Sequence, residues 1–258
     1  MLKKRFVGVV TVRQGWAVQS FGYNRYLPLG KPECVVENLD RWGVDEIFIQ
    51  EIDRSRHQLG PNINLINKIA SRGLSTPLLY AGGITCEADA VAVVRSGVER
   101  VCVDSLLHEN PNELRNIANA LGTQAVLASL PIAKDLNGNV GWYRYRTNGF
   151  VDSCKDLRSL IDDNVISELI VIDKENEGNP NQFDFGLLPF VKEFNIPLIL
   201  FGGLSESVQL EKAFSNSQVS AAAVGNFLNY KEHAVQKYKE QLSSAPIRPP
   251  FYYSRSLM

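Results

Sequence analysis

Cysteine is scarce in this chain, and its spacing excludes two kinds of site. Four of the 258 residues are cysteine, no two of them form a CxxC pair, and none has a histidine nearby. The sequence therefore predicts neither a zinc site nor a disulfide framework. We expect free, buried thiols of a cytoplasmic protein at Cys34, Cys86, Cys102 and Cys154.

Histidine, long apolar runs and a surplus of one charge are lacking too. The three histidines lie far apart, and none neighbours a candidate nucleophile, so we expect them in loops or on the surface. No apolar run approaches the ~20 residues of a membrane-spanning helix, and the start MLKKRFVGVV is too short and strand-like for a signal peptide. A net charge of −1 predicts neither nucleic acid nor a membrane as partner.

Short apolar runs, by contrast, recur along the whole chain. We predict strands at 6–12, 46–52, 77–81, 100–104, 125–130, 168–173, 197–201 and 221–225. Amphipathic stretches between them predict helices at 33–42, 61–72, 86–96, 111–121, 153–163, 184–194, 206–214 and 231–242. This alternation indicates an α/β fold, the (β/α)8 TIM barrel. A doubly wound open sheet is the alternative that spacing alone leaves open.

An internal repeat favours the barrel. TPLLYAGGIT begins at Thr76 and IPLILFGGLS begins at Ile196, 120 residues later, and DEIFIQEID (45–53) resembles SELIVIDKE (167–175). We therefore expect one domain, 1–242, built from half-barrels of about 1–122 and 123–242. The tail 243–258 is rich in proline and aromatics, and we expect it to lie over the barrel or against a partner.

Paired glycines follow two of the predicted strands. Backbone N–H groups at such turns can approach an anion, and another candidate follows one strand later in each half. The predicted phosphate contacts are Gly82, Gly83 and Ser105 in the first half, and Gly202, Gly203, Gly225 and Asn226 in the second. Two related sites would suit a ligand with two phosphates. The alternative is that the glycines only permit tight turns.

These segments carry a resemblance to a known family. LKKRFVGVVTVRQGWAV, GVDEIFIQEID, PLLYAGGI, GVERVCVDSLLHENP, LGTQAV, SELIVIDKENEG and IPLILFGGLSE together make the chain similar to the cyclase subunit of imidazole glycerol phosphate synthase, over roughly residues 2–242. The resemblance implies a half-barrel repeat that takes ammonia from a glutaminase subunit docked at the bottom of the barrel. It implies passage of that ammonia to a bisphosphate at the top, adds Gly178 to the phosphate contacts, and implies no metal or cofactor.

The family's catalytic positions are altered here. Its essential aspartates at the ends of strands 1 and 5 correspond to Thr11 and Pro131, and its first-loop lysine corresponds to Gln19. Neither threonine nor proline can serve as a general acid or base. Substitute acids near the mouth are available at Glu51, Asp104, Asp173, Glu175 and Glu177. Their alternative role is to bind solvent or lysines.

The bottom of the barrel keeps the family's pattern. The ring of charges at the ammonia entrance corresponds to Arg5, Glu46, Arg100 and Glu168. Glu99 and Gln124 match positions at the glutaminase interface. A purely architectural ion-pair plug is the alternative to a gate.

Two aromatic segments could serve the mouth. SFGYNRYLPLG (20–30) is predicted to be a lid or a packed loop, and WYRYR (142–146) an anion or sugar contact or a hairpin with exposed arginines.

The pattern as a whole favours an ammonia-using paralogue with changed chemistry. The resemblance extends to paralogues in surface-polysaccharide pathways, where ammonia helps convert an acetamido sugar to an acetamidino sugar. It implies a glutaminase partner in a heterodimer, an ATP-dependent amidotransferase partner, and a phosphorylated or nucleotide-sugar ligand. The alternatives are a true cyclase of histidine biosynthesis and a non-catalytic scaffold.

Overall fold

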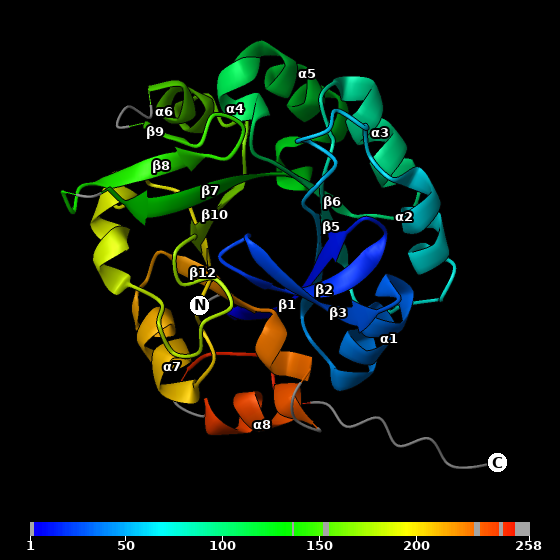
Figure 1. The fold of residues 1–258 in the computed structure, drawn as a ribbon, viewed down its shortest axis with the longest axis vertical. Coiled ribbons are helices and arrows are strands. Elements are labelled where there is room, and N and C mark those ends of the chain that lie inside the picture. Colours follow the sequence, from blue (N-terminus) through cyan, green and yellow to red (C-terminus); the bar gives the residue numbers. More distant parts are fainter. Residues whose placement is uncertain (1–2, 136, 152–154, 230–232, 243–244, 251–258) are drawn as a thin grey trace.

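Eight parallel strands close into a barrel in the computed structural model, which describes residues 3–135, 137–151, 155–229, 233–242 and 245–250 (Figure 1). The strands pair in the order β1, β4, β5, β6, β7, β10, β11 and β12, and β12 pairs with β1 again. Their bounds are β1 Arg5–Arg13, β4 Glu46–Glu51, β5 Leu78–Ala81, β6 Arg100–Val103, β7 Val126–Lys134, β10 Glu168–Asp173, β11 Leu198–Phe201 and β12 Val219–Val224. The (β/α)8 prediction is confirmed.

Helices surround the barrel (Figure 1). They are α1 Pro32–Trp42, α2 Ile63–Ala70, α3 Glu87–Arg95, α4 Leu106–Glu109, α5 Pro111–Leu121, α6 Lys155–Asp162, α7 Ser207–Ser215 and α8 Ala234–Gln241. Three short 3-10 helices are η1 Thr123–Ala125, η2 Phe185–Phe190 and η3 Asn226–Asn229. Among the described residues, no helix has the length and apolar character needed to cross a membrane.

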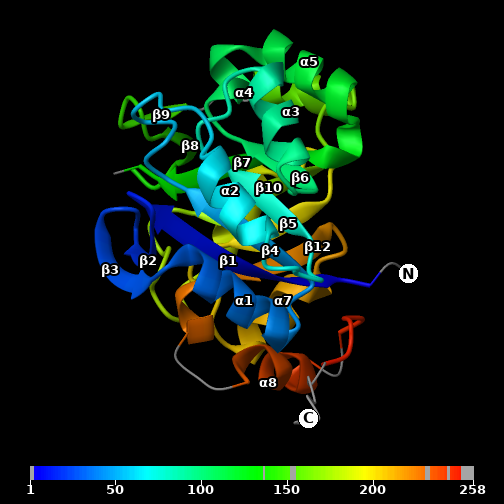
Figure 2. The same ribbon diagram turned by 90° about the vertical axis from the view of Figure 1, so that its right-hand side faces the viewer.

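Two hairpins extend from corresponding strands of the two halves. β2 (Trp16–Phe21) and β3 (Arg25–Gly30) follow β1, whereas β8 (Val140–Arg144) and β9 (Gly149–Val151) follow β7. Both project from the end of the barrel where the parallel strands finish, which we call the mouth (Figure 2). The opposite end, where the strands begin, is the floor. The predicted loop 20–30 is thus largely strand, and WYRYR lies on a hairpin.

One predicted helix is wrong in type and length. The segment 184–194 forms only the six-residue η2, which begins after the Asp184 cap and contains Pro189. Proline has no N–H for the helical ladder and clashes with the preceding turn, so a regular α-helix cannot run through it.

The expected burial of all cysteines is also wrong. Cys34 is exposed and Cys86 is intermediate, whereas Cys102 is buried. Cys34 lies in the first turn of α1, whose core-facing side is instead formed by Val35, Val36 and Leu39. Cys154 lies outside the described residues.

The described part of the C-terminal tail lies at the floor. The N–H of Lys4 donates to the carbonyl of Pro246 at 2.9 Å, and Lys4 forms a parallel bridge with Ile247. The Arg248 guanidinium lies 3.9 Å from the Asp45 carboxylate. Both ends of the described chain therefore meet beside the start of β1. Residues 243–244 and 251–258 of the predicted tail lie outside the described residues.

Candidate functional site

Strand β1 places one candidate site residue at each end of the barrel, Arg5 at the floor and Thr11 near the mouth. Val7 and Val9 belong to the apolar cluster inside the barrel. Because side chains alternate along a strand, Arg5 and Thr11 face the same interior.

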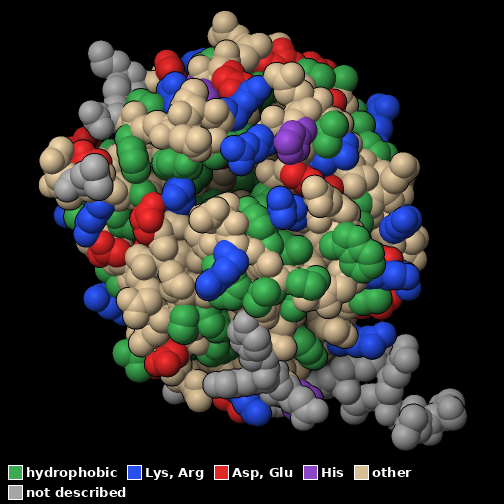
Figure 3. Space-filling view, viewed as in Figure 1, with side chains coloured by type: hydrophobic (Ala, Val, Ile, Leu, Met, Phe, Trp, Pro, Cys, Tyr) green, Lys and Arg blue, Asp and Glu red, His purple; other side chains and the backbone are tan. Residues whose placement is uncertain are grey.

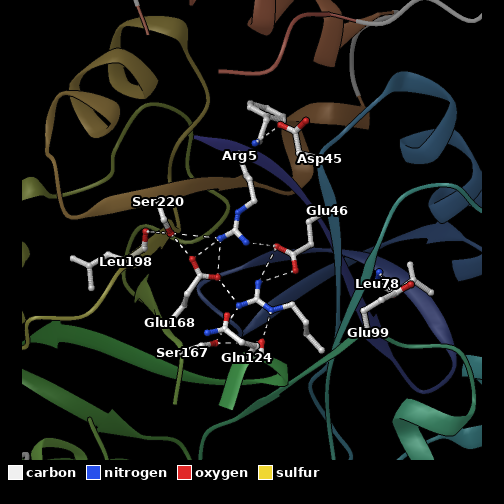
Figure 4. Close-up of polar contacts among 12 residues, drawn as sticks. Arg5, Asp45, Glu46, Leu78, Glu99, Gln124, Ser167, Glu168, Leu198 and Ser220 are labelled. Carbon is white, nitrogen blue, oxygen red and sulfur yellow. Dashed lines mark hydrogen bonds and ion pairs between the residues drawn. The ribbon is translucent and has the colours of Figure 1, made fainter. Parts of the chain in front are cut away.

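Four charged side chains close the floor in a ring (Figure 4). Arg5 pairs with Glu46 at 3.4 Å and with Glu168 at 2.6 Å. Arg100 pairs with the same two carboxylates, at 3.0 Å and 2.6 Å. Each glutamate therefore bridges both arginines. We call these four residues the floor ring, and they come from the starts of β1, β4, β6 and β10.

The acidic members of the floor ring are withdrawn from water. Glu46 is 3% exposed and Glu168 is 8% exposed. Burial raises the pKa of Glu168, but the charges of Arg5 and Arg100 outweigh burial and hold that pKa below its ordinary value. Burial likewise lowers the pKa of Arg100, and the two glutamates raise it by more. Both shifts favour the charged forms of Glu168 and Arg100, and removing one member of the ring would leave a buried charge without its partner.

The two residues that the resemblance assigns to the glutaminase interface, Glu99 and Gln124, lie beside the floor ring (Figure 4). Glu99 and Gln124 are exposed. The Glu99 carboxylate accepts from the N–H of Leu78 at 2.6 Å, and the Gln124 carbonyl accepts from Nε of Arg100 at 3.3 Å. Sequence reasoning missed Ser220, whose hydroxyl donates to Glu168 Oε1 at 2.6 Å. Its one signal was a polar residue in the apolar strand VSAAAV.

Apolar side chains fill the barrel between floor and mouth. This cluster consists of Val7, Val9, Phe48, Leu79, Cys102, Leu127, Ile170, Ile172, Ile199, Phe201, Ala221 and Ala223. Burial raises the pKa of the Cys102 thiol well above its ordinary value, so the thiol stays neutral. An uncharged molecule would therefore meet no ionised group in this cluster.

A pocket of about 900 Å³, counting its solvent-open part, lies in the mouth. Its lower part includes Cys102, Ser129 and Pro131. Its walls carry the tyrosines and cations Tyr23, Tyr26, Tyr143, Tyr145, Arg56 and Lys174. We call it the mouth pocket. Figure 3 views the molecule from this side and shows Lys and Arg side chains around a hollow.

The glycines of both pairs pack closely against neighbouring backbone. All four glycines have positive φ, between 71° and 145°. A Cβ on Gly83 would lie 2.2 Å from the carbonyl oxygen of Gly60, and one on Gly203 would lie 2.8 Å from the amide nitrogen of Phe183. The N–H of Gly83 also donates to the Ser55 hydroxyl at 2.9 Å. These contacts fit the tight-turn alternative, and phosphate binding at these glycines stays a prediction.

The first hairpin is fastened to the second half of the barrel. The Ser20 N–H donates to Asn226 Oδ1 at 3.2 Å, and its carbonyl accepts from Asn226 Nδ2 at 2.7 Å. The Ser20 hydroxyl donates to the Glu177 carboxylate at 2.9 Å, as does the Tyr23 N–H at 3.2 Å. The Gly22 N–H donates to the Glu177 carbonyl at 2.8 Å. We call these five residues the hairpin latch.

The hairpin latch covers Thr11 and the second set of predicted phosphate contacts. A Cβ on Gly178 would lie 2.1 Å from the Ser20 carbonyl oxygen. A cavity of about 280 Å³ remains there, lined in part by Thr11, Glu177, Gly178, Gly202, Gly203, Gly225 and Asn226. Thr11 and Pro131 therefore line separate cavities. Gln19, at the position of the family's lysine, is buried in β2.

Three of the possible substitute acids already accept hydrogen bonds from other residues of the chain. The Glu51 carboxylate accepts from Asn62 Nδ2 at 2.9 Å. The Asp173 carboxylate accepts from the N–H of Asp184 at 2.8 Å. Glu177 belongs to the hairpin latch. Burial is the largest cause of a raised pKa at each of these three carboxyl groups.

Asp104 differs from these acids. It lines the mouth pocket, is partly exposed, and accepts no side-chain hydrogen bond from the described residues. Burial and then the charge of Glu109 raise the pKa of Asp104 to about 8. A carboxyl group that titrates near neutral pH can both take up and release a proton. The described residues contain no group of three or more His, Cys, Asp or Glu side chains suited to a metal ion.

We expect Asp104→Asn to flatten the dependence of stability on pH. The folded carboxyl keeps its proton up to about pH 8, whereas the unfolded one loses it near 3.8, so wild-type stability falls as pH rises between these values. Because the carboxyl group is partly exposed, we expect the free energy of unfolding of the variant to exceed that of wild type by about 2 kcal/mol at pH 8.5 and by little at pH 4. Urea unfolding across this range measures the difference. Parallel pH profiles would contradict the assignment.

Comparisons with known proteins agree with this architecture. The family described as histidine biosynthesis protein matches residues 6–234. A Vibrio vulnificus protein provisionally named imidazole glycerol phosphate synthase subunit hisF2 is 26% identical over 250 residues, covering 96% of this chain and 91% of the relative. The imidazole glycerol phosphate synthase subunit HisF of Streptococcus sanguinis is 23% identical over 249 residues, covering 95% and 98%. The family match spans most of the barrel, and the chain belongs to the histidine biosynthesis protein family.

Proposed function

We propose that this chain is the ammonia-accepting barrel of a glutamine amidotransferase system. Ammonia from a glutaminase subunit enters at the floor and supports amination, or amidine formation, on a phosphate-bearing or nucleotide-sugar substrate. The setting that we propose is surface-polysaccharide biosynthesis in the cytoplasm, with an ATP-dependent amidotransferase as a further partner. The observation that carries the proposal is the floor ring, in which each glutamate bridges both arginines.

The arrangement behind the ring supports a conduit. The floor ring is followed along the barrel axis by apolar side chains and then by the mouth pocket. Neutral ammonia crosses an apolar path more readily than ammonium, because the charged form would lose its hydration there. Glu99 and Gln124 are exposed beside the ring and would face a protein docked on the floor. The relatives' names, which call them subunits, fit a protein that works in a complex.

Two residues argue against the family's cyclase reaction in this chain. Thr11 lies under the hairpin latch, and Pro131 has no ionisable group. Each lost proton transfer removes on the order of 10²–10⁴-fold in rate. We therefore propose changed chemistry at the mouth and a preserved floor.

A histidine auxotroph that lacks its own cyclase subunit tests the reaction. We expect expression of this chain to leave the strain unable to grow without histidine, because both proton-transfer positions lack a suitable group. The strain's own cyclase subunit, expressed from the same vector, is the control. Restored growth would overturn the proposal in favour of a true cyclase.

Glutaminase stimulation tests the floor. We expect the purified chain to raise glutamine hydrolysis by a class-I glutaminase from the same organism. We expect Arg5→Ala and Glu46→Ala to change that stimulation. Arg158→Ala is a matched control, because it removes an arginine whose ion pair with Glu193 is exposed on the outer surface. If all three variants behaved like wild type, the floor ring would be an architectural plug.

A further inference from the structure

The two cavities described above differ in the room that they leave for a ligand. The hairpin latch covers Thr11, and within it the Asn226 side chain is taken up by two hydrogen bonds with the buried Ser20 backbone. The mouth pocket, in contrast, is large enough for a sugar-sized ligand and contains Asp104 and Ser105. A ligand in the mouth pocket would therefore lie over the ends of β4, β5, β6, β7 and β10, outside the small cavity that Thr11 lines.

The base of the mouth pocket lies close above the floor ring along the barrel axis. Every second residue of β6, and the residue that follows the strand, faces the inside of the barrel. These residues are Arg100, Cys102 and Asp104. Two residues of strand span about 7 Å, so one apolar layer separates the floor ring from the base of the pocket. A small molecule that passes this layer enters the mouth at Cys102 and Ser129, next to Asp104.

The walls of the mouth pocket indicate the class of ligand. Tyr23 and Tyr145 come from the two hairpins. Burial raises the pKa of both hydroxyls, followed by the charge of Glu177 at Tyr23 and that of Asp104 at Tyr145. Tyrosine faces stack on sugars and planar bases. The Lys174 ammonium lies 4.4 Å from the centre of the Tyr143 ring, where it could meet a phosphate. Stacking surfaces beside cations suit a nucleotide-linked sugar.

We propose that ammonia meets its acceptor in the mouth pocket and that Asp104 is the catalytic residue that takes the proton from the attacking nitrogen. This inference rests on the proposed function. Among the five candidate acids named for the mouth, Asp104 combines a place in the pocket lining with a carboxylate that the described residues leave without a hydrogen bond. Glu175, the fifth of them, pairs with Lys174 at 2.9 Å. The acceptor is a nucleotide-linked sugar whose amide oxygen carries a phosphoryl-type group supplied by an ATP-dependent partner.

The step balances with these reactants. The lone pair of ammonia forms a bond to the amide carbon, and the nitrogen gives one proton to the Asp104 carboxylate. The bond between that carbon and its activated oxygen then breaks, and the oxygen leaves with the electron pair on its phosphoryl group. The product is an amidine, and Asp104 returns its proton to solvent.

An isotope-transfer experiment tests Asp104. Purified chain, its glutaminase, ATP and glutamine labelled with ¹⁵N in the amide are added to a lysate of a strain that lacks this gene. The lysate supplies the acceptor and its activating enzyme. Mass spectrometry measures ¹⁵N in the sugar-nucleotide fraction, and glutamate release is measured in the same tube. The variants are Asp104→Asn and, as a control, Asp162→Asn, which changes an exposed carboxylate on α6.

We expect Asp104→Asn to lower ¹⁵N transfer about 100-fold, the value of a lost general base, while glutamate release stays within about twofold of wild type. Asp162→Asn should match wild type in both. Unchanged transfer in Asp104→Asn would overturn the role of Asp104 and leave the proposed function standing. Wild-type chain that neither stimulates glutamate release nor supports transfer would overturn the proposed function itself, and the role of Asp104 with it.

Discussion

Replacing Glu168 by alanine is expected to cost about 3–5 kcal/mol of unfolding free energy. Its carboxylate accepts from Arg5 at 2.6 and 2.8 Å, from Arg100 at 2.6 Å and from Ser220 at 2.6 Å. Alanine would leave two neighbouring guanidinium groups sharing only Glu46. Urea unfolding at pH 7 measures the loss.

The acid dependence of this contribution has a defined sign. Because the pKa of Glu168 is lower in the folded chain than its ordinary 4.5, its contribution is complete above that pH. It is lost as the pH falls through the folded value. The difference between wild type and Glu168→Ala should therefore shrink in acid.

Glu193→Ala is the matched control for this variant. Glu193 pairs with Arg158 at 2.9 Å, but their side chains are 79% and 48% exposed. Exposed pairs contribute at most about 1 kcal/mol. If the two alanine variants lost similar amounts, the floor ring would be solvated and could not act as a closed barrier.

A second large effect is expected from Gly178→Ala. Gly178 has a φ of 81°, and a Cβ there would lie 2.1 Å from the Ser20 carbonyl oxygen. The Ser20 carbonyl oxygen belongs to the backbone and cannot rotate away as a flexible side chain can. The hairpin must therefore move away from Glu177 and Asn226. We expect a loss of at least about 3 kcal/mol, since a large strain adds to the broken hydrogen bonds. Hydrogen exchange should quicken in residues 16–30.

Gly15→Ala separates backbone strain from the lost contact. Gly15 lies in the turn before β2 with a φ of 78°, and an added Cβ would have no atom within 4 Å. We expect only the intrinsic penalty of about 1–2 kcal/mol for a left-handed alanine. If Gly178→Ala lowered the free energy of unfolding no more than Gly15→Ala does, the first hairpin would not pack against Gly178.

The barrel could be predicted from the sequence because its signals are local. The run from Phe6 to Val12 and the segment EIFIQE at 46–51 are apolar, end at turns, and recur at a regular spacing. The resemblance then assigned Arg5 to the floor and Thr11 to the mouth end of the same strand. The floor ring followed from the resemblance, and its four members do lie together.

The rest of the site depends on contacts between distant residues. Ser20 and Glu177 are 157 residues apart, so no local pattern predicts that the first hairpin closes over Thr11. The same holds for Asn62, which holds Glu51 through a side-chain contact across a loop. The choice of Asp104 among several acids required knowledge of which carboxylates the fold already uses. Ser220 was missed because one serine in an apolar strand has many structural roles.

The meeting of Lys4 with Pro246 and Ile247 has a practical consequence for the partner experiments. Both described ends of the chain stand at the floor, on the face where we propose that the glutaminase docks. An affinity tag fused near either end would compete for that face and could mimic a failure to bind. Pull-downs should therefore carry the tag on the glutaminase, or within the exposed turn at Asn137–Asn139 on the mouth side. Joining the two ends by a short linker would give a circular permutant whose new termini could be placed at that turn.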